Sequence, residues 1–426
     1  MLTPVNNGDG TYTLTPIPAH QVMPSLNTET ASLMDGALRR GEIGTDDAHI
    51  FSSSGGTRLL SRAISTKYGG ADSLAASVTI ESVERAIVVA AVPQMTLVAN
   101  HAGANAIMGR LGASNLGGSL LTVDTGGTVG TGMAAGDGFD MHYAKPGFGM
   151  WIMPLYQNWS GFGLEGGNYE MDAHGALGGV ALGADYTFGN ALRAGITVNM
   201  GGGYVEGSGD FHSSTNNLTF WGAGLYAGWA PGAFGLFAEV NFTSTYNSIA
   251  QELPASMQMG NLEADVNSWA LTAGLRAQYT FVTDWLNITL HAGFRFSHLK
   301  TEAYDMESSG LTVLEGDAVH QDIWSFPVGV TFAKSFTLDN NWYVKPSLDL
   351  RVTPNAGDIN ARGDVRFTGV SDLSSMKSQT MDYLTYGGTA GLEFGRDNIK
   401  IGLNYNLEAG EHSTQHGVFI TFRYEF

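Results

Sequence analysis

The chain has 426 residues, a formal net charge of −19, 58 glycines and no cysteine, and only 14% of its residues are charged. With 43% hydrophobic residues it is too apolar for a disordered chain, and its acidity excludes a nucleic-acid-binding protein that relies on a basic surface. The absence of cysteine excludes a disulfide scaffold, a thiol nucleophile and a zinc–thiolate site, and the absence of any run of 18 apolar residues predicts no transmembrane helix.

Residues 1–70 are polar and rich in turn-forming residues, such as NNGDG at 6–10 and SSSGG at 52–56, with one alternating run at 11–17. The first seven residues carry neither the positive region nor the apolar core of a secretory signal peptide. If the chain is exported, we expect its signal to lie upstream. We interpret residues 1–70 as the remnant of a passenger segment or the junction to it.

Residues 71–112 are predicted to be helical. Asp72 and Ser73 can cap the helix, and the alanine- and leucine-rich run that follows favours its propagation. Pro93 ends or restarts it, since proline is tolerated at the first helical position. Small residues dominate the second piece, at 93–112, and a glycine-rich spacer follows it, so residues 71–147 form a linker helix and spacer.

From residue 148 to residue 426 the hydrophobic pattern has a period of two, which is typical of β-strands with two different faces. Leu286, Ile288 and Leu290 share one face, for example, and the polar residues between them share the other. About twelve such runs occur, near residues 148–159, 169–188, 191–205, 217–230, 233–247, 262–281, 285–302, 319–336, 341–354, 380–395, 398–408 and 414–426.

The connections between these runs alternate between short and long. Short turns such as Gly189-Asn190 alternate with longer polar segments, at 160–168, 206–216, 248–261, 303–318, 355–379 and 409–413. An outer-membrane barrel has this asymmetry, and its tilted strands need about 9–11 residues. Charged residues within the runs keep to one parity, which would face the lumen. The sequence therefore predicts an all-β fold, an antiparallel transmembrane β-barrel over residues 148–426.

The last strand, GVFITFRYEF, alternates apolar residues and ends on an aromatic side chain. Together with GRLG at 109–112 and FGMWIMPLYQNW at 148–159, it resembles the translocator β-domain of autotransporters, the type V secretion family. The resemblance covers about residues 71–426. It implies a 12-stranded barrel whose N-terminal α-helix threads the lumen and a passenger upstream of that helix, outside the cell. It also implies that the barrel-assembly machinery reads Phe422, Tyr424 and Phe426.

The size of such a barrel supports a helix in the lumen independently. Side chains just fill a barrel of eight strands, so twelve strands leave room for one helix of about 10–12 Å diameter. The polar helix residues that would meet the lumen are Asn100, His101, Asn105 and Arg110. The charged lumen-lining candidates are Asp185, Arg193, Glu239, Arg276, Arg295, Lys345, Asp349, Arg351, Glu393 and Arg423. The alternative is an amphipathic helix packed at the periplasmic end.

Motifs for catalysis or metal binding are absent from the sequence, which has no Walker loop, no HExxH motif and no cysteine–histidine cluster. Glu411, His412 and His416 lie near a predicted external loop and are interpreted as solvated residues. Autotransporters that cleave their own linker resemble one another in an Asn-Asn pair, which residues 93–112 lack. We expect no catalytic residue, no metal and no cofactor.

An Arg-Gly-Asp tripeptide at 362–364 lies in the longest predicted loop, 355–379, and has the form of an integrin ligand. Because nothing else in the sequence supports that role, we interpret it as a chance occurrence.

Together these observations predict the outer-membrane translocator unit of an autotransporter, which exports or anchors an upstream passenger at the cell surface. The expected partners are outer-membrane lipid, the barrel-assembly machinery, periplasmic chaperones and the chain's own passenger; we expect a monomer that binds no nucleic acid. Three alternatives remain: a porin-like channel with an N-terminal plug, a surface adhesin acting through its long loops, and a soluble acidic β protein.

Overall fold

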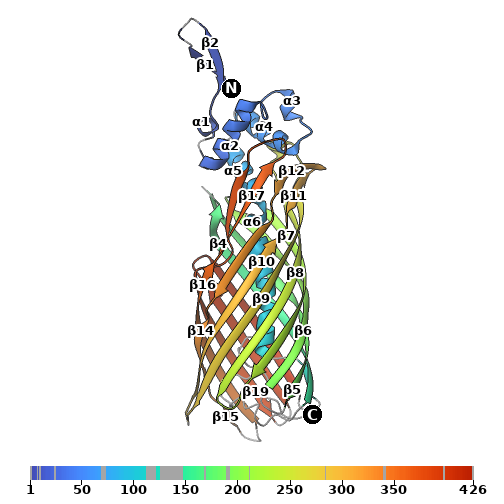
Figure 1. Ribbon diagram of the computed structural model, residues 1–426, viewed down its shortest axis with the longest axis vertical. Coiled ribbons are helices and arrows are strands. Elements are labelled where there is room, and N and C mark those ends of the chain that lie inside the picture. Colours follow the sequence, from blue (N-terminus) through green and yellow to red (C-terminus); the bar gives the residue numbers. More distant parts are fainter. Residues whose placement is uncertain are drawn as a thin grey trace.

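The computed structural model describes residues 2–6, 8, 11–23, 25–68, 73–111, 121–124, 147–166, 169–188, 192–210, 212–283, 285–338, 342–396 and 399–424. A closed antiparallel β-barrel surrounds a helix, and several short helices cover one end of the barrel (Figure 1). The C-terminus lies at the opposite end, together with the short turns (Figure 1).

The barrel wall has twelve strand positions, which confirms the predicted strand number. In order around the wall they are β4 (Gly147–Gly166), β5 (Tyr169–Phe188), β6 (Leu192–Gly209), β7 (Ser214–Trp229), β8 (Phe234–Gln251), β9 (Leu262–Val282), β10 (Asn287–Thr301), β13 (Val319–Ser325) with β14 (Val328–Ala333), β16 (Trp342–Gly357), β19 (Leu384–Arg396), β20 (Ile399–Ala409) and β21 (Ser413–Tyr424). Strands β13 and β14 share one position, because both pair with β10 on one side and β16 on the other.

The barrel closes where the last strand meets the first. β21 pairs with β4 from Ser413, opposite Gly161, to His416, opposite Asn158. A short strand, β3 (Leu121–Asp124), pairs with residues 149–152 near the other end of β4. The two-residue strand β15 (Phe336–Thr337) adds to the edge of β16. With every strand paired on both sides of the ring, the barrel has no free edge, as a spanning sheet requires in lipid.

Several strands are much longer than a bilayer requires. β4 and β5 have 20 residues each and β9 has 21, about twice the 9–11 residues of a tilted span. The long loops expected at 160–168, 206–216, 303–318 and 355–379 are therefore wrong for the most part. Their residues extend the long strands or form the hairpins β11 (Tyr304–Ser308)–β12 (Leu311–Gly316) and β17 (Asn360–Phe367)–β18 (Ser374–Gln379).

These extensions are strands because antiparallel backbone hydrogen bonds do not need an apolar face. Beyond the bilayer the outward face meets water instead of lipid, so only inward-facing residues such as Leu314 and Phe367 remain apolar, and the segment has the composition of a loop. The tripeptide at 362–364 illustrates this, since it lies within β17, where Arg362 is opposite Lys377 of β18. Between β8 and β9 the connection is a loop that contains the short 3₁₀ helix η2 (Ala255–Met257).

Two belts of aromatic side chains mark the part of the barrel that spans the membrane. The belt near the short turns contains Phe148, Tyr186, Phe188, Trp229, Phe234, Tyr279, Phe281, Trp342 and Phe394, all exposed. The second belt contains Tyr156, Trp221, Phe242, Trp269, Phe294, Trp324 and Tyr386. Within it, the ring centre of Phe242 lies 5.7 Å from that of Trp221 and 6.0 Å from that of Trp269.

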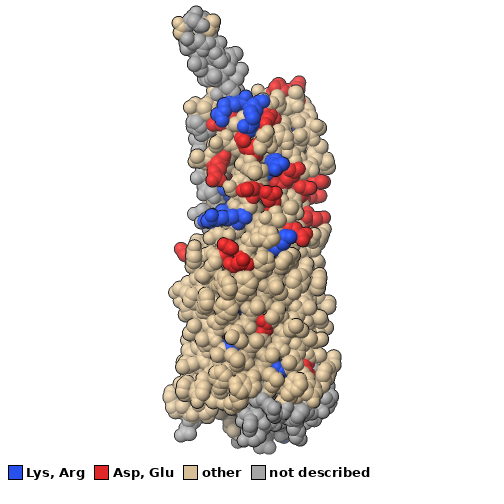
Figure 2. All heavy atoms as spheres, viewed as in Figure 1, with Lys and Arg blue, Asp and Glu red and all other residues tan. Residues whose placement is uncertain are grey.

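The spacing of the belts fits a bilayer. Trp221 and Trp229 are eight positions apart on β7, or about 26 Å along the strand, which a tilt of about 40° reduces to about 20 Å. Leu225 lies midway and is 61% exposed. Figure 2 shows that charged side chains gather on the upper part of this face, whereas the part below is almost entirely uncharged. The arrangement is that of an outer-membrane barrel with aromatic girdles.

A lid of three helices, residues 25–68, covers the end of the barrel that carries the strand extensions (Figure 1). It consists of α2 (Thr28–Arg40), α3 (Asp47–Ile50) and α4 (Gly55–Tyr68), and is preceded by the hairpin β1 (Leu2–Asn6)–β2 (Tyr12–Pro16) and by α1 (Ala19–Val22). The side chain of Asn27 caps α2, and Gly41 ends it at φ 69°. The turn-forming residues of this segment thus serve largely as caps of short helices, a structure that its composition alone did not indicate.

Candidate functional site: the helix in the barrel lumen

The lumen of the barrel is filled by helices α5 (Ser73–Glu84), α6 (Ala86–Val89) and α7 (Val92–Arg110). By length and composition the stretch Ala86–Arg110 could cross a membrane, but 94% of its most apolar 18 residues are buried. A break between α6 and α7 centres on Ala91, whose φ of 49° is left-handed, and Pro93 follows in the first turn of α7. The predicted helical segment is thus confirmed as helix over residues 73–84, 86–89 and 92–110, with its second break directly before the turn that holds Pro93. The predicted cap Asp72 and residue 112 lie outside the described residues.

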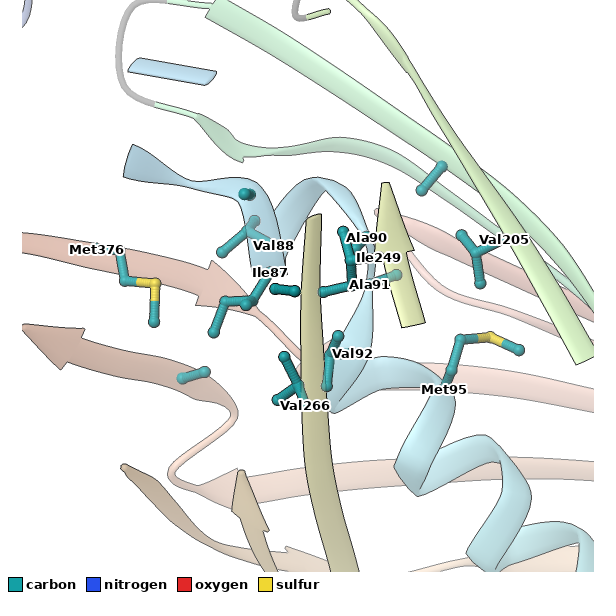
Figure 3. Packing of buried hydrophobic residues seen from close by; sticks show 14 of the residues in the cluster. Ile87, Val88, Ala90, Ala91, Val92, Met95, Val205, Ile249, Val266 and Met376 are labelled. Atoms are coloured by element: carbon teal, nitrogen blue, oxygen red, sulfur yellow. The ribbon is translucent and has the colours of Figure 1, made fainter. Parts of the chain in front are cut away.

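The upper part of this helical segment packs in an apolar neck. Figure 3 shows Ile87, Val88, Val92 and Met95 among side chains that come from the surrounding strands. Those strand residues are Val205, Ile249, Val266 and Met376, all 3% exposed or less. These buried apolar side chains form a closely packed neck around the helix.

Small residues let α7 approach the wall. A Cβ added at Gly103 would lie 2.6 Å from Asn199 Nδ2 and 3.0 Å from Asn241 Nδ2. The wall has matching glycines: a Cβ at Gly224 would lie 2.8 Å from Ile107 of the helix. α7 packs against β4, β5 and β7–β10, so one side of the helix is close to the wall.

Asn100 is the most extensively bonded polar residue of the helix. Its Nδ2 donates to the carbonyl oxygens of Asn241 and Ala270, at 3.1 and 3.0 Å, and its Oδ1 accepts from Thr272 Oγ1 at 2.5 Å. Asn241 returns a bond to the carbonyl oxygen of Asn100 at 3.0 Å. Four bonds at one buried residue, three of them to its side chain, fix both the height and the rotation of the helix.

The next turn of the helix meets charged groups of the wall. Asn105 Oδ1 accepts a hydrogen bond of 3.1 Å from Arg295, whose guanidinium also lies 3.1 Å from Glu239 Oε1. His101 Nε2 lies 3.3 Å from Ser297 Oγ. The structure thus brings Asn105, Arg295 and Glu239 together in one chain of contacts.

The inner end of α7 is fixed by an ion pair. Arg110 donates from Nε and from its second terminal nitrogen to the two oxygens of Asp185, at 2.6 and 2.9 Å. Tyr226 Oη donates to the same carboxylate at 2.8 Å and accepts from Trp151 Nε1 at 2.7 Å. Arg193 Nε lies 3.6 Å from Asp185 Oδ1. Paired charges of this geometry are the form in which buried ions are tolerated.

Beside the helix the lumen retains a cavity of about 110 Å³. Arg276 and Arg351 of the wall line it, opposite His101 and Asn105 of the helix. Arg351 contacts Glu408 at 2.9 Å and Asp349 at 3.8 Å.

Near the short turns, further charged groups occupy the lumen. The Asp349 carboxylate also accepts from Thr331 at 2.6 Å and lies 2.9 Å from His291 Nε2. Lys345 is 1% exposed and faces Glu393 across the β16–β19 ladder. Glu393 accepts a bond of 2.8 Å from Tyr343.

The remaining candidates lie in the last strand. Phe422, Arg423 and Tyr424 belong to β21, where their backbone pairs with β20. Phe426 lies outside the described residues. Near the outer end of the same strand, His412 lies 3.3 Å from Asp382. Within the described ranges, no group of three or more His, Asp or Glu side chains could hold a metal ion.

Sequence reasoning missed the uncharged residues of the site. Asn241, Thr272, Tyr226 and Trp151 all bond to the helix or to its ion pair, directly or through one neighbour. They occupy the alternate positions of their strands that face the lumen, and this alternation is the feature of the sequence that indicates them. Charge identifies candidate lumen residues in the sequence, whereas neutral polar residues are too common on any lumen face to be distinguished there.

Comparisons with known proteins give one family match and several similar solved structures. The model of the family "Autotransporter beta-domain" matches residues 150–406. Similar solved structures include the translocator domain of the autotransporter NalP from Neisseria meningitidis, with 16% identity, a TM-score of 0.46 and coverage of 65% of this chain and 88% of that one. Another is the transport unit of the autotransporter AIDA-I from Escherichia coli, with 15% identity, a TM-score of 0.49 and coverage of 65% and 90%. No curated protein sequence matches the chain.

The family match covers well over half of the chain and includes the strands whose lumen faces hold the helix. It favours a translocator over the plugged channel, the adhesin and the soluble protein that the sequence left open. The chain belongs to the autotransporter β-domain family and is an outer-membrane translocator unit of a Gram-negative bacterium.

Proposed function

We propose that this chain exports a passenger and then anchors it at the cell surface by retaining the pore helix α7 in the lumen. The observation that carries the proposal is the set of bonds around the helix, from Asn100 in its middle to Arg110 at its inner end. These bonds hold a helix that connects the two ends of the lumen. The chain N-terminal to α5 therefore lies beyond the end that carries the strand extensions.

The orientation follows from the loops. Outer-membrane barrels have short periplasmic turns and longer external segments. Here the short connections, such as residues 230–233 between β7 and β8, lie at the same end as the C-terminus, and the hairpins β11–β12 and β17–β18 lie at the other. The lid and everything before it would then be extracellular.

The roles of individual residues follow from the same contacts. Asn100, His101, Asn105 and Arg110 fix the helix, and Asp185, Arg193, Glu239 and Arg295 receive it. Arg276, Lys345, Asp349, Arg351 and Glu393 keep the remaining lumen polar. None of these roles is catalytic: the unit supplies a closed wall and a seat for the helix, and needs no cofactor.

Assembly would use the C-terminal strand. We propose that Phe422, Tyr424 and Phe426 are read by the barrel-assembly machinery after periplasmic chaperones have delivered the chain, and that the barrel functions as a monomer. In this division residues 1–70 form the junction to the passenger, residues 71–147 the linker, and residues 148–426 the barrel.

An epitope at the N-terminus tests the proposal. The chain is expressed behind a signal peptide in a Gram-negative host, and intact cells are treated with protease. We expect the epitope to be lost while a membrane-embedded barrel fragment remains. A second epitope in the turn at 230–233 should stay protected until the outer membrane is permeabilised. An assembled barrel whose N-terminal epitope resists protease would contradict the proposal.

A further inference from the structure

The lid is joined to the barrel more tightly than a flexible connector would be. Helix α4 packs on β12, β17 and η2, all of which belong to the external extensions of the barrel. Leu59, Leu60 and Ala63 of α4 are completely buried. The apolar cluster that they join includes Leu314 of β12 and Phe367 of β17. The lid thus completes an apolar core that the external hairpins cannot close alone.

The first turn of α4 interlocks with the backbone of the hairpins. The backbone N–H of Thr57 donates to the carbonyl oxygen of Thr368 at 2.9 Å, and that of Gly56 donates to Thr368 Oγ1 at 2.9 Å. A Cβ added at Gly56 would lie 2.4 Å from the backbone nitrogen of Thr368, and one at Gly55 would lie 2.5 Å from the carbonyl oxygen of Thr312. Only glycine permits this approach at both positions.

Polar contacts fix the rest of the lid. Arg62 of α4 donates to the carbonyl oxygens of Met257 and Gln258, at 2.6 and 2.5 Å. At the end of α2, Arg40 pairs with Asp372 at 2.8 Å in the connection between β17 and β18. The lid therefore contacts the barrel at three separate places around its mouth.

The lid is also bonded to the helices that continue into the lumen. The backbone N–H of Asn27 donates to Glu81 at 2.6 Å, and Thr30 Oγ1 donates to Glu84 at 2.7 Å. Both glutamates belong to α5 and are completely buried. Any displacement of α5 toward the periplasm would have to draw the lid with it.

The folded lid is too large to follow α5 inward. α2 and α4 have 13 and 14 residues and are each about 20 Å long, and a helix with side chains is about 10–12 Å wide. The lumen holds one helix, closely packed in the neck. Because the lid precedes α7 in the chain, it also has to cross the barrel unfolded before it can form.

We propose that the lid, residues 25–68, is a stopper that folds on the external hairpins after it has emerged and prevents the pore helix from sliding back into the periplasm. This rests on the proposed function, because it assumes that the chain before α7 is exported. The stopper acts at the outer end of the helix, and the Arg110–Asp185 pair acts at the inner end. Folding of the lid would thus be the step that makes export irreversible.

The test uses the purified full-length chain in planar lipid bilayers, where export plays no part. Gly56→Val places a side chain against the backbone of Thr368, whereas Gly178→Val is the matched control, since a Cβ there meets nothing within 4 Å. Undocking is measured first, as cleavage by trypsin after Arg58. We expect Gly56→Val to raise both cleavage and the open time of the pore at least tenfold, and Gly178→Val to change neither. Tenfold faster cleavage with an unchanged open time would overturn the proposal.

A second test joins the lid to the barrel through a reversible disulfide, and it applies if the Gly56→Val variant does not assemble. A Cβ at Gly36 would lie 2.4 Å from Asp372 Oδ2, so side chains at these two positions touch, and we pair cysteines there in a chain that has no other cysteine. We expect oxidation of Gly36→Cys/Asp372→Cys to reduce the frequency of openings at least threefold, and reduction to restore it. Equal frequencies in the oxidised and reduced forms would refute the stopper. Neither outcome bears on the N-terminal epitope experiment, so failure of one proposal can be told from failure of the other.

Discussion

The ion pair at the inner end of the pore helix gives a quantitative prediction. Arg110 and Asp185 are joined by bonds of 2.6 and 2.9 Å, and their side chains are 0% and 1% exposed. Removing one partner of a buried pair costs about 3–5 kcal/mol, because it leaves a charge uncompensated. Arg110→Met should lower the free energy of unfolding by about 3 kcal/mol, since Arg193 and Tyr226 still contact Asp185. Asp185→Asn should lower the free energy of unfolding by about 5 kcal/mol, because two buried guanidinium groups then lose their carboxylate partner.

The assay is urea unfolding of the chain refolded in lipid, followed by tryptophan fluorescence. A double-mutant cycle isolates the pair: the double variant should cost less than the sum of the single variants by about 2 kcal/mol or more. Arg39→Met is the matched control, because Arg39 is exposed on α2, and its effect should stay within about 0.5 kcal/mol. If Arg110→Met costs no more than this control, the ion pair does not hold the helix and the reasoning fails.

Three further predictions concern the membrane face, the helix and the lid. Leu225→Arg, at the midplane of the outer face, should lower the free energy of unfolding by about 2–4 kcal/mol, whereas Asn217→Arg, above the aromatic belt on the same strand, should cost under about 1 kcal/mol; comparable losses would mean that the belts do not mark the bilayer. Gly103→Ala overpacks the helix against two asparagines and should cost about 1–3 kcal/mol in the same assay, with Gly178→Ala near zero; a neutral Gly103→Ala would contradict the close approach. A hydrogen bond from Arg40, and more weakly one from Ser371, lowers the pKa of Glu42 to about 2. The stabilisation that these bonds give the lid is therefore complete above pH 4.5 and is lost as the pH falls toward 2. Hydrogen exchange of the lid should therefore accelerate over that range, and Glu42→Gln should remove the dependence; the same acceleration in the variant would exclude Glu42 as its cause.

The sequence predicts the spanning part of the barrel well, because the physics there is local. Each strand separates lipid from lumen, so alternate residues must differ, and a charge on the lipid face is costly. The strand at 286–296 illustrates this: Leu290 is 51% exposed, whereas Thr289 and His291 beside it are 2% and 5% exposed. The short turns and the helical segment broken at Pro93 follow from equally local signals.

Beyond the bilayer the same reasoning fails. Helix α4 begins at Gly55 and Gly56, inside the SSSGG run that indicates a loop. These glycines are required by the close approach to Thr312 and Thr368, which are more than 250 positions away in the chain. The site has the same limit: Arg110 and Asp185 are both recognisable as candidates, but their contact depends on the height of the helix in the lumen. No local pattern encodes that height.

The most direct test of the account is whether α7 lies in the lumen at this height. Thr96 of the helix and Thr245 of β8 have hydroxyl oxygens 2.8 Å apart, and both residues are buried. The account predicts that Thr96→Cys/Thr245→Cys, assembled in the outer membrane of intact cells, forms a disulfide in nearly every molecule, while each single variant stays reduced. It would be contradicted if both thiols of the assembled double variant remained reduced.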